Sequence, residues 1–112
     1  MNKRKVGKYF EEFAIKYLER KSYKILTRNF YYKGGEIDII AYKSNKLHFI
    51  EVKYRATDKY GMAIESIDNK KINRIKKGIN YFLYINAIDS NIDISINLFL
   101  IDGNNVEIIE LI

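Results

Sequence analysis

The sequence predicts one α/β domain built on a mixed sheet (mixed-sheet α+β), with its elements in the order helix, three strands, helix, two strands. Two segments carry apolar residues at the 3.6-residue spacing of helices, and five shorter segments have the apolar content and turn boundaries of strands. The 112 residues, 47% of them hydrophobic, suit a single compact domain over residues 1–112. Because cysteine is absent, disulfides and thiolate zinc sites are excluded.

The first half of the chain is expected to form one helix and three strands. Apolar residues from Phe10 to Leu18 make one helical stripe, and turns are expected at Lys33-Gly34-Gly35 and at Lys43–Lys46. The second turn would join its two strands in an antiparallel hairpin. The expected bounds are Val6–Lys21 for the helix and Tyr23–Phe30, Glu36–Tyr42 and Leu47–Tyr54 for the strands.

The second half is expected to form a long amphipathic helix and two strands. Isoleucine, phenylalanine and leucine residues recur on one face of the helix, and basic residues lie on another face. The turn Asp102-Gly103-Asn104-Asn105 separates the strands. The expected bounds are Ser66–Tyr84 for the helix, and Ile92–Ile101 and Val106–Leu111 for the strands.

Charged residues interrupt the two strands expected at the middle of the sheet. Because side chains alternate along a strand, Glu36 and Asp38 should share a face. Glu51 and Lys53 should likewise share a face, separated by roughly 7 Å, with His48 on the opposite face in a structural role. Pairing through the hairpin would bring Asp38 and Glu51 together at one edge of the sheet.

The chemistry predicted for these charges is metal-dependent phosphodiester hydrolysis. Carboxylates brought together repel each other, and a divalent cation bound by oxygen ligands, Mg²⁺ or Mn²⁺ rather than zinc, would compensate. Lys53 would orient or deprotonate the attacking water, or stabilise charge on the phosphate. The alternative is a surface ion pair between Glu51 and Lys53, because Glu-x-Lys is a short motif that recurs at Glu19–Lys21.

Two stretches resemble the signature of the YraN family: GEIDII at Gly35–Ile40 and FIEVKYR at Phe49–Arg55. Members of this family are small bacterial proteins predicted to be endonucleases of the PD-(D/E)xK, restriction-endonuclease-like fold, related to archaeal Holliday-junction resolvases. The resemblance runs from about Val6 to Leu83. Its weaker single matches are Gly7, Glu11, Ala14, Tyr17, Leu18, Arg28, Asn29, Tyr60, Gly61, Ile67 and Lys71.

The resemblance implies the roles of four residues. Asp38 and Glu51 would be the metal ligands, and Lys53 would be the catalytic lysine. Glu11 would be an acid on the first helix that supports the metal or its water. The neighbouring Glu12 is the alternative for that role, because one sequence does not show which of the two points inward.

Further residues would complete this centre. The backbone carbonyl of Val52 would add a metal ligand. Glu36 would lie beside the ligands and support them without binding the metal directly. The sequence departs from the family at Asn91–Asp93, where the family commonly has Arg-Phe-Asp, and at Tyr54, which replaces a small polar residue. Neither departure changes a proposed metal ligand.

A net charge of +6 favours a polyanionic partner, with nucleic acid ahead of an anionic membrane surface. The family resemblance implies DNA, branched DNA included, as this partner. A homodimer, a cytoplasmic location and no membrane contact are also expected. The rival function is a non-catalytic nucleic-acid-binding or partner-docking module. Tyr31, Tyr32, Tyr54 and Tyr60 could stack unpaired bases, although tyrosine is also common in sheets. The candidate phosphate-binding residues are Lys70, Lys71, Arg74, Lys77 and Arg55, and the alternative for the helix residues is a solvated basic face.

Overall fold

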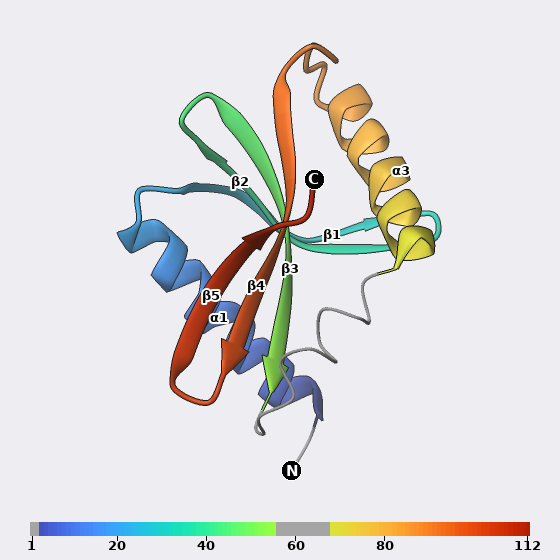
Figure 1. Cartoon of the computed structure of the whole chain (residues 1–112). Helices are drawn as coiled ribbons and strands as arrows, with labels where there is room; N and C mark the ends of the chain where they lie inside the picture. Colours follow the sequence, from blue (N-terminus) through green and yellow to red (C-terminus); the bar gives the residue numbers. More distant parts are fainter. Residues whose placement is uncertain (1–2, 56–67) are drawn as a thin grey trace.

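A computed structural model describes residues 3–55 and 68–112 (Figure 1). Over these residues it contains two helices and a five-stranded sheet of order β1-β2-β3-β4-β5. The expected fold class and the order of the elements are confirmed. The bounds are α1 Lys3–Arg20, β1 Lys24–Tyr32, β2 Gly35–Lys43, β3 Lys46–Arg55, α3 Asn69–Ile85, β4 Asp93–Asp102 and β5 Asn105–Glu110.

The sheet is mixed because one of its neighbouring pairs is parallel. β1–β2, β2–β3 and β4–β5 are antiparallel, so the expected β2–β3 hairpin is confirmed. β3 and β4 run parallel from Lys46 beside Asp93 to Arg55 beside Asp102. A parallel pair needs a crossover connection, and α3 lies in this one.

The two helices cover opposite faces of the sheet (Figure 1). On one face, Ile75, Ile79 and Phe82 of α3 pack in a core that also holds Phe49 of β3. On the other face, α1 packs against the neighbouring Ile50. The side chains of β3 therefore alternate between the two cores, as expected for a central strand buried on both sides.

Local side chains set the ends of α3 and β1. α3 begins after Asp68, whose carboxylate accepts a hydrogen bond from the N–H of Lys71 (2.9 Å) as an N-cap does. The start expected at Ser66 lies outside the described residues. β1 extends two residues beyond the expected Phe30, because Tyr31 and Tyr32 continue its pairing with β2. Neither described helix is long and apolar enough to cross a membrane.

Strand β2 loses its regular alternation at Asp38. Ile37 packs in the core under α3, whereas Ile39 packs in the core under α1. Residues two apart on a regular strand share a face, so the strand rotates between them. Opposite Asp38 on β1, Asn29 has a φ of +52°, a left-handed conformation that asparagine adopts more readily than most residues. Because of this irregularity, the Asp38 carboxylate does not follow the direction that regular alternation along β2 would give it.

His48 lies in a polar cluster at the start of β3, on the face opposite Glu51. Its Nδ1 lies 2.9 Å from the hydroxyl of Ser95, which donates to Asn97 Oδ1 at 2.8 Å. Ser95 is fully buried and Asn97 nearly so. Buried polar groups need such partners, so the structural role expected for His48 agrees with its contacts.

Candidate active site

The candidate site lies where β2 separates from β3. The two strands pair as far as Ile39 beside Ile50, and the next residues along them are Asp38 and Glu51. The N–H of Val52 donates to Oδ2 of Asp38 at 2.8 Å. This bond holds the Asp38 carboxylate against β3, so the hairpin register brings the two predicted metal ligands together.

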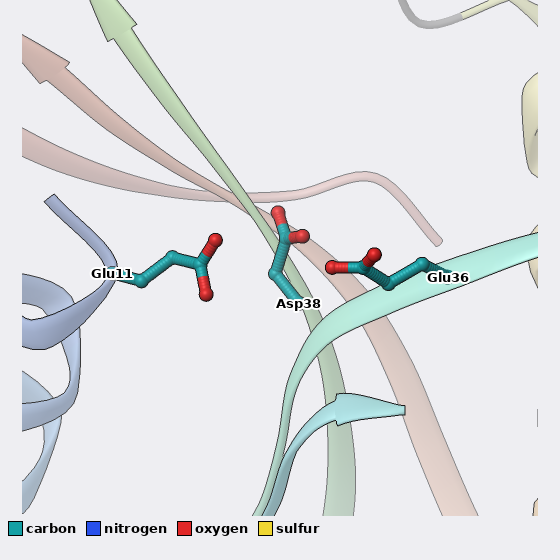
Figure 2. A group of neighbouring side chains, drawn as sticks. All are labelled: Glu11, Glu36 and Asp38. Carbon is teal, nitrogen blue, oxygen red and sulfur yellow. The ribbon is translucent and has the colours of Figure 1, made fainter. Parts of the chain in front are cut away.

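Three acids from two elements, α1 and β2, meet at this point. Glu11 of α1 and Glu36 and Asp38 of β2 each place one carboxylate oxygen within 4.8 Å of the others (Figure 2). All three side chains are half-buried. In Figure 2 they point toward one another, with Asp38 between the other two. Glu36, expected only to support the ligands, therefore lies as close to the centre as Glu11 does.

The structure distinguishes Glu11 from Glu12. Glu12 forms an ion pair with Arg28 of β1 and is not part of the acidic cluster. Glu11 points into the cluster, and burial, then the charges of Asp38 and Glu36, raise the pKa of its carboxyl. Burial and then the charge of Asp38 raise the pKa of Glu36 in the same way. These shifts are expected where like charges converge without a cation.

Asn29 also belongs to the cluster. With its amide turned to donate, Nδ2 lies 2.8 Å from Oε1 of Glu11 and 3.0 Å from Oε1 of Glu36. The sequence resemblance included Asn29 but gave it no role. The available signal was an asparagine inside a predicted strand, where this residue type is depleted unless the backbone is irregular.

Glu51 is the most buried of the candidate acids, with 5% of its surface exposed. Its pKa is raised to about 8, mainly by burial, then by the charge of Asp38 and by a hydrogen bond with Asp38. Lys71 and Lys53 act in the opposite direction. Among the described residues, its Oε1 is the one buried side-chain atom without a hydrogen-bond partner. An acid buried in this state is costly to the fold, which indicates a functional role.

Two lysines from different elements meet beside these acids. Burial and then the charge of Lys71 lower the pKa of Lys53, while Glu51 and Asp38 raise it. Lys71 also makes a side-chain hydrogen bond with Lys53 that favours the neutral form of Lys53. Lys71 was expected only to bind phosphate, but it lies in the first turn of α3 next to the predicted catalytic lysine.

A single cleft of ≈ 610 Å³ connects the predicted catalytic and metal-binding residues. Lys71, Phe10 and Tyr54 also contribute to its wall. A smaller pocket of ≈ 200 Å³ adjoins it on the α3 side and shares Glu36, Glu51 and Lys71 with it. The predicted residues that line the cleft are Glu11, Glu36, Asp38, Glu51, Val52 and Lys53.

The other predicted nucleic-acid contacts lie outside the cleft. Arg74 lines the smaller pocket, one helical turn after Lys71. Lys70 and Lys77 are exposed on α3 and line neither space, and Arg55 ends β3 without lining either. The sequence departs from the family at Asn91–Asp93 but keeps an acid at Asp93. Asp93 pairs with Lys46 at the end of β3 opposite to Glu51. This difference from the family is therefore far along the strand from the candidate acids.

Comparison with known proteins identifies relatives over most of the chain. A UPF0102 protein of Fusobacterium nucleatum is 47% identical over 83 residues, which cover 74% of this chain and 70% of the relative. A UPF0102 protein of Carboxydothermus hydrogenoformans is 44% identical over 88 residues, covering 79% and 75%. One from a Sulfurihydrogenibium species is 41% identical over 106 residues, covering 95% and 91%.

The model of a protein family described as "Uncharacterised protein family UPF0102" matches residues 10–102. This range includes both signature stretches and every residue of the acidic cluster. The relatives and the family model agree, and the chain belongs to the UPF0102 family, the YraN group that its sequence resembles.

Proposed function

We propose that this protein is a metal-dependent endonuclease that hydrolyses phosphodiester bonds in DNA, with branched or otherwise structured DNA among its substrates. One observation carries the proposal: a single cleft brings together the acids Glu11, Glu36, Asp38 and Glu51 and the lysines Lys53 and Lys71. Surfaces that only bind DNA have no use for clustered carboxylates, because these repel phosphate. The restriction-endonuclease-like fold implied by the sequence resemblance supports the same chemistry.

The donor set of the cleft fits Mg²⁺ or Mn²⁺. Glu11, Glu36 and Asp38 would hold the ion through carboxylate oxygens, which hard divalent cations prefer. Oε1 of Glu51 lacks a hydrogen-bond partner and would add a further oxygen nearby. When bound, the ion would supply positive charge that activates water and stabilises a phosphoryl oxygen.

The remaining roles belong to residues of the chain itself. Asp38 is oriented by the N–H of Val52, so its carboxylate is held in place before any ligand arrives. Lys53, with its lowered pKa, would position the attacking water and exchange a proton with it more readily than an ordinary lysine. Lys71, which lies beside Lys53 in the same cleft, would pair with a phosphate oxygen.

A DNA partner accords with the basic character of the chain. The net charge is +6, and Arg74 continues the positive wall of Lys71 into the smaller pocket. Lys70, Lys77 and Arg55 would then contact phosphates farther from the cut. A homodimer in the cytoplasm would suit a substrate with two strands to cut.

The proposal is tested by cleavage of labelled DNA and RNA substrates in Mg²⁺, Mn²⁺ or EDTA. The substrates are linear duplex, flap, four-way junction, single-stranded DNA and RNA. Glu11 and Glu12 supply a matched pair of variants, because they are neighbours of the same type and only Glu11 faces the cluster. We expect Glu11→Gln to lower cleavage by at least about 100-fold and Glu12→Gln to change it less than about threefold.

The outcomes separate the two candidate functions. Metal-dependent cleavage that is lost in Glu11→Gln and in Glu51→Ala, with both variants folded, supports the endonuclease. Salt-sensitive binding without cleavage in either metal would instead favour the non-catalytic nucleic-acid-binding module. Equal loss of activity in Glu11→Gln and Glu12→Gln would show that the acidic cluster is not the centre.

A further inference from the structure

We infer that Tyr54, backed by Phe10, is a stacking platform for an unpaired nucleobase next to the phosphate bound in the cleft. This inference rests on the proposed function, because it assigns a substrate class to the same cleft. It implies that the nucleotide beside the scissile phosphate is unpaired, whatever the structure of the DNA around it. The observations that lead to it are the packing of the two rings and their position.

Tyr54 and Phe10 form the closest aromatic pair of the described residues. Their ring centroids lie 3.9 Å apart, with 15° between the planes, so one face of Tyr54 is covered by Phe10. Even so, 44% of the Tyr54 residue is exposed. Phe10 of α1 thus covers one face of the ring, while nearly half of the residue stays exposed. A rigid, half-covered ring of this kind is what a base needs for stacking.

The position of the pair links it to the phosphate chemistry. Both rings line the same ≈ 610 Å³ cleft as Asp38, Glu51 and Lys53. Tyr54 directly follows Lys53 on β3, so the two side chains leave opposite sides of the strand, yet both residues line this one cleft. A nucleotide whose phosphate lies at Lys53 would therefore have its base in the part of the cleft that Tyr54 borders.

The other tyrosines considered from the sequence do not share this position. Tyr31 is 69% exposed but does not line the cleft, and Tyr32 lines the smaller pocket, with its ring against Gly78. Tyr60 lies outside the described residues. Tyr54 is thus the one of the four for which the described residues show a ring in the cleft.

Stacking on Tyr54 selects for an unpaired base. A base inside a duplex is covered on both faces by its neighbours and must unstack before it can offer a face to a side chain. Base–aromatic stacking is tolerant of sequence, because every base has a π-face. The platform would therefore recognise the absence of pairing rather than a particular base.

The test uses a short oligothymidylate that carries one 2-aminopurine, a base whose fluorescence is quenched by stacking. Binding is measured in an Asp38→Asn background, which prevents cleavage, and the chain has no tryptophan to interfere with the signal. We expect quenching that persists in Tyr54→Phe, is lost in Tyr54→Leu, and is unaffected by Tyr84→Ala on the exposed face of α3. Tyr54→Leu should also weaken binding by about tenfold.

Two comparisons make the inference falsifiable. Thermal unfolding must show that Tyr54→Leu is folded, and leucine is chosen because it keeps an apolar contact with Phe10. The same 2-aminopurine placed in a perfect duplex should show no dependence on Tyr54. Equal quenching in Tyr54→Leu and Tyr54→Phe, or equal dependence in single strand and duplex, would overturn the inference.

The test distinguishes a failure of this inference from a failure of the nuclease proposal. Quenching that depends on Tyr54, together with no cleavage by the wild-type chain in any metal, would refute the nuclease and keep the platform. Cleavage by the wild type without Tyr54-dependent quenching would support the nuclease and refute the stacking platform.

Discussion

At the residue scale, the buried Glu51 makes the free energy of unfolding depend on pH. Burial and the neighbouring Asp38 raise the pKa of Glu51 from its ordinary 4.5 to about 8. The folded protein therefore keeps this proton at a pH where the unfolded chain has released it. By linkage, the contribution of Glu51 to stability is full below pH 4.5 and falls as the pH rises toward 8.

Replacing Glu51 with glutamine should remove this pH dependence. In metal-free buffer, we expect the free energy of unfolding of Glu51→Gln to match the wild type near pH 5. It should exceed the wild type by roughly 4 kcal/mol or more above pH 8, because the pKa of Glu51 differs by about 3.5 between the folded and unfolded states and each unit is worth about 1.4 kcal/mol. Urea unfolding across pH 5 to 9 measures the difference, and Glu19→Gln on the exposed end of α1 is the control. Parallel curves for Glu51→Gln and the wild type would show that the acid is not shifted.

The site residues differ in how far the sequence could predict them. The hairpin register was enough to place Asp38 next to Glu51, because it follows from the local turn pattern. The choice of Glu11 over Glu12 depends on how α1 is rotated on the sheet, and the helical period leaves neighbouring residues unresolved. The place of Glu36 in the acidic cluster depends on the irregular strand geometry at Asp38 and Asn29. A periodic sequence pattern does not show such an irregularity.

At the element scale, α3 lies close to β1 because Gly78 faces the ring of Tyr32. A Cβ added to Gly78 would lie 2.5 Å from Cε1 of that ring, and 2.8 Å from two further ring atoms. The glycine was part of a predicted helix, where it lowers helix propensity by about 1 kcal/mol relative to alanine. Gly78 instead allows α3 to approach β1 closely, because a side chain at this position would meet the ring of Tyr32.

Gly78→Ala should therefore destabilise the protein despite its better helix propensity. We expect a loss of about 1–2 kcal/mol, because the Tyr32 ring must move to make room. In a Tyr32→Ala background the clash is absent, and the same substitution should be neutral or stabilising. Urea unfolding of the four proteins gives the coupling free energy. An unchanged cost of Gly78→Ala in both backgrounds would contradict the packing argument.

The elements themselves were largely predictable, since their apolar periods and turn residues agree with the structure. Differences are confined to ends such as β1, where two tyrosines continue the ladder past Phe30. The parallel pairing of β3 with β4 was not predicted. It depends on the long crossover that contains α3, and no local pattern specifies which strand a crossover returns to.

At the scale of the whole molecule, the acidic cluster joins a helix to the sheet. Glu11 comes from α1 and Glu36 and Asp38 from β2, so the cluster exists only when α1 is docked. A cation that binds this cluster binds the folded state alone and must stabilise it.

Mg²⁺ or Mn²⁺ should raise the melting temperature of the wild type. At a concentration 100 times the dissociation constant, the expected gain is about 2.7 kcal/mol. Calorimetric titration near pH 7 should also show proton release, because Glu51 must ionise when the metal binds. Glu11→Gln should reduce both effects, and Glu12→Gln should leave them intact. Equal metal stabilisation in the two variants would place the ion elsewhere.

The interruption shared by Asn29 and Asp38 makes stability and activity compete for the same two positions. A β-branched residue in place of Asn29 would favour a regular strand, and a strand that alternates without interruption would turn the Asp38 carboxylate away from Glu11. Selection for thermal stability alone would favour such a β-branched residue in place of Asn29. Under the proposed function, the irregular pair is kept for the metal site, at a cost in stability that the rest of the sheet must offset.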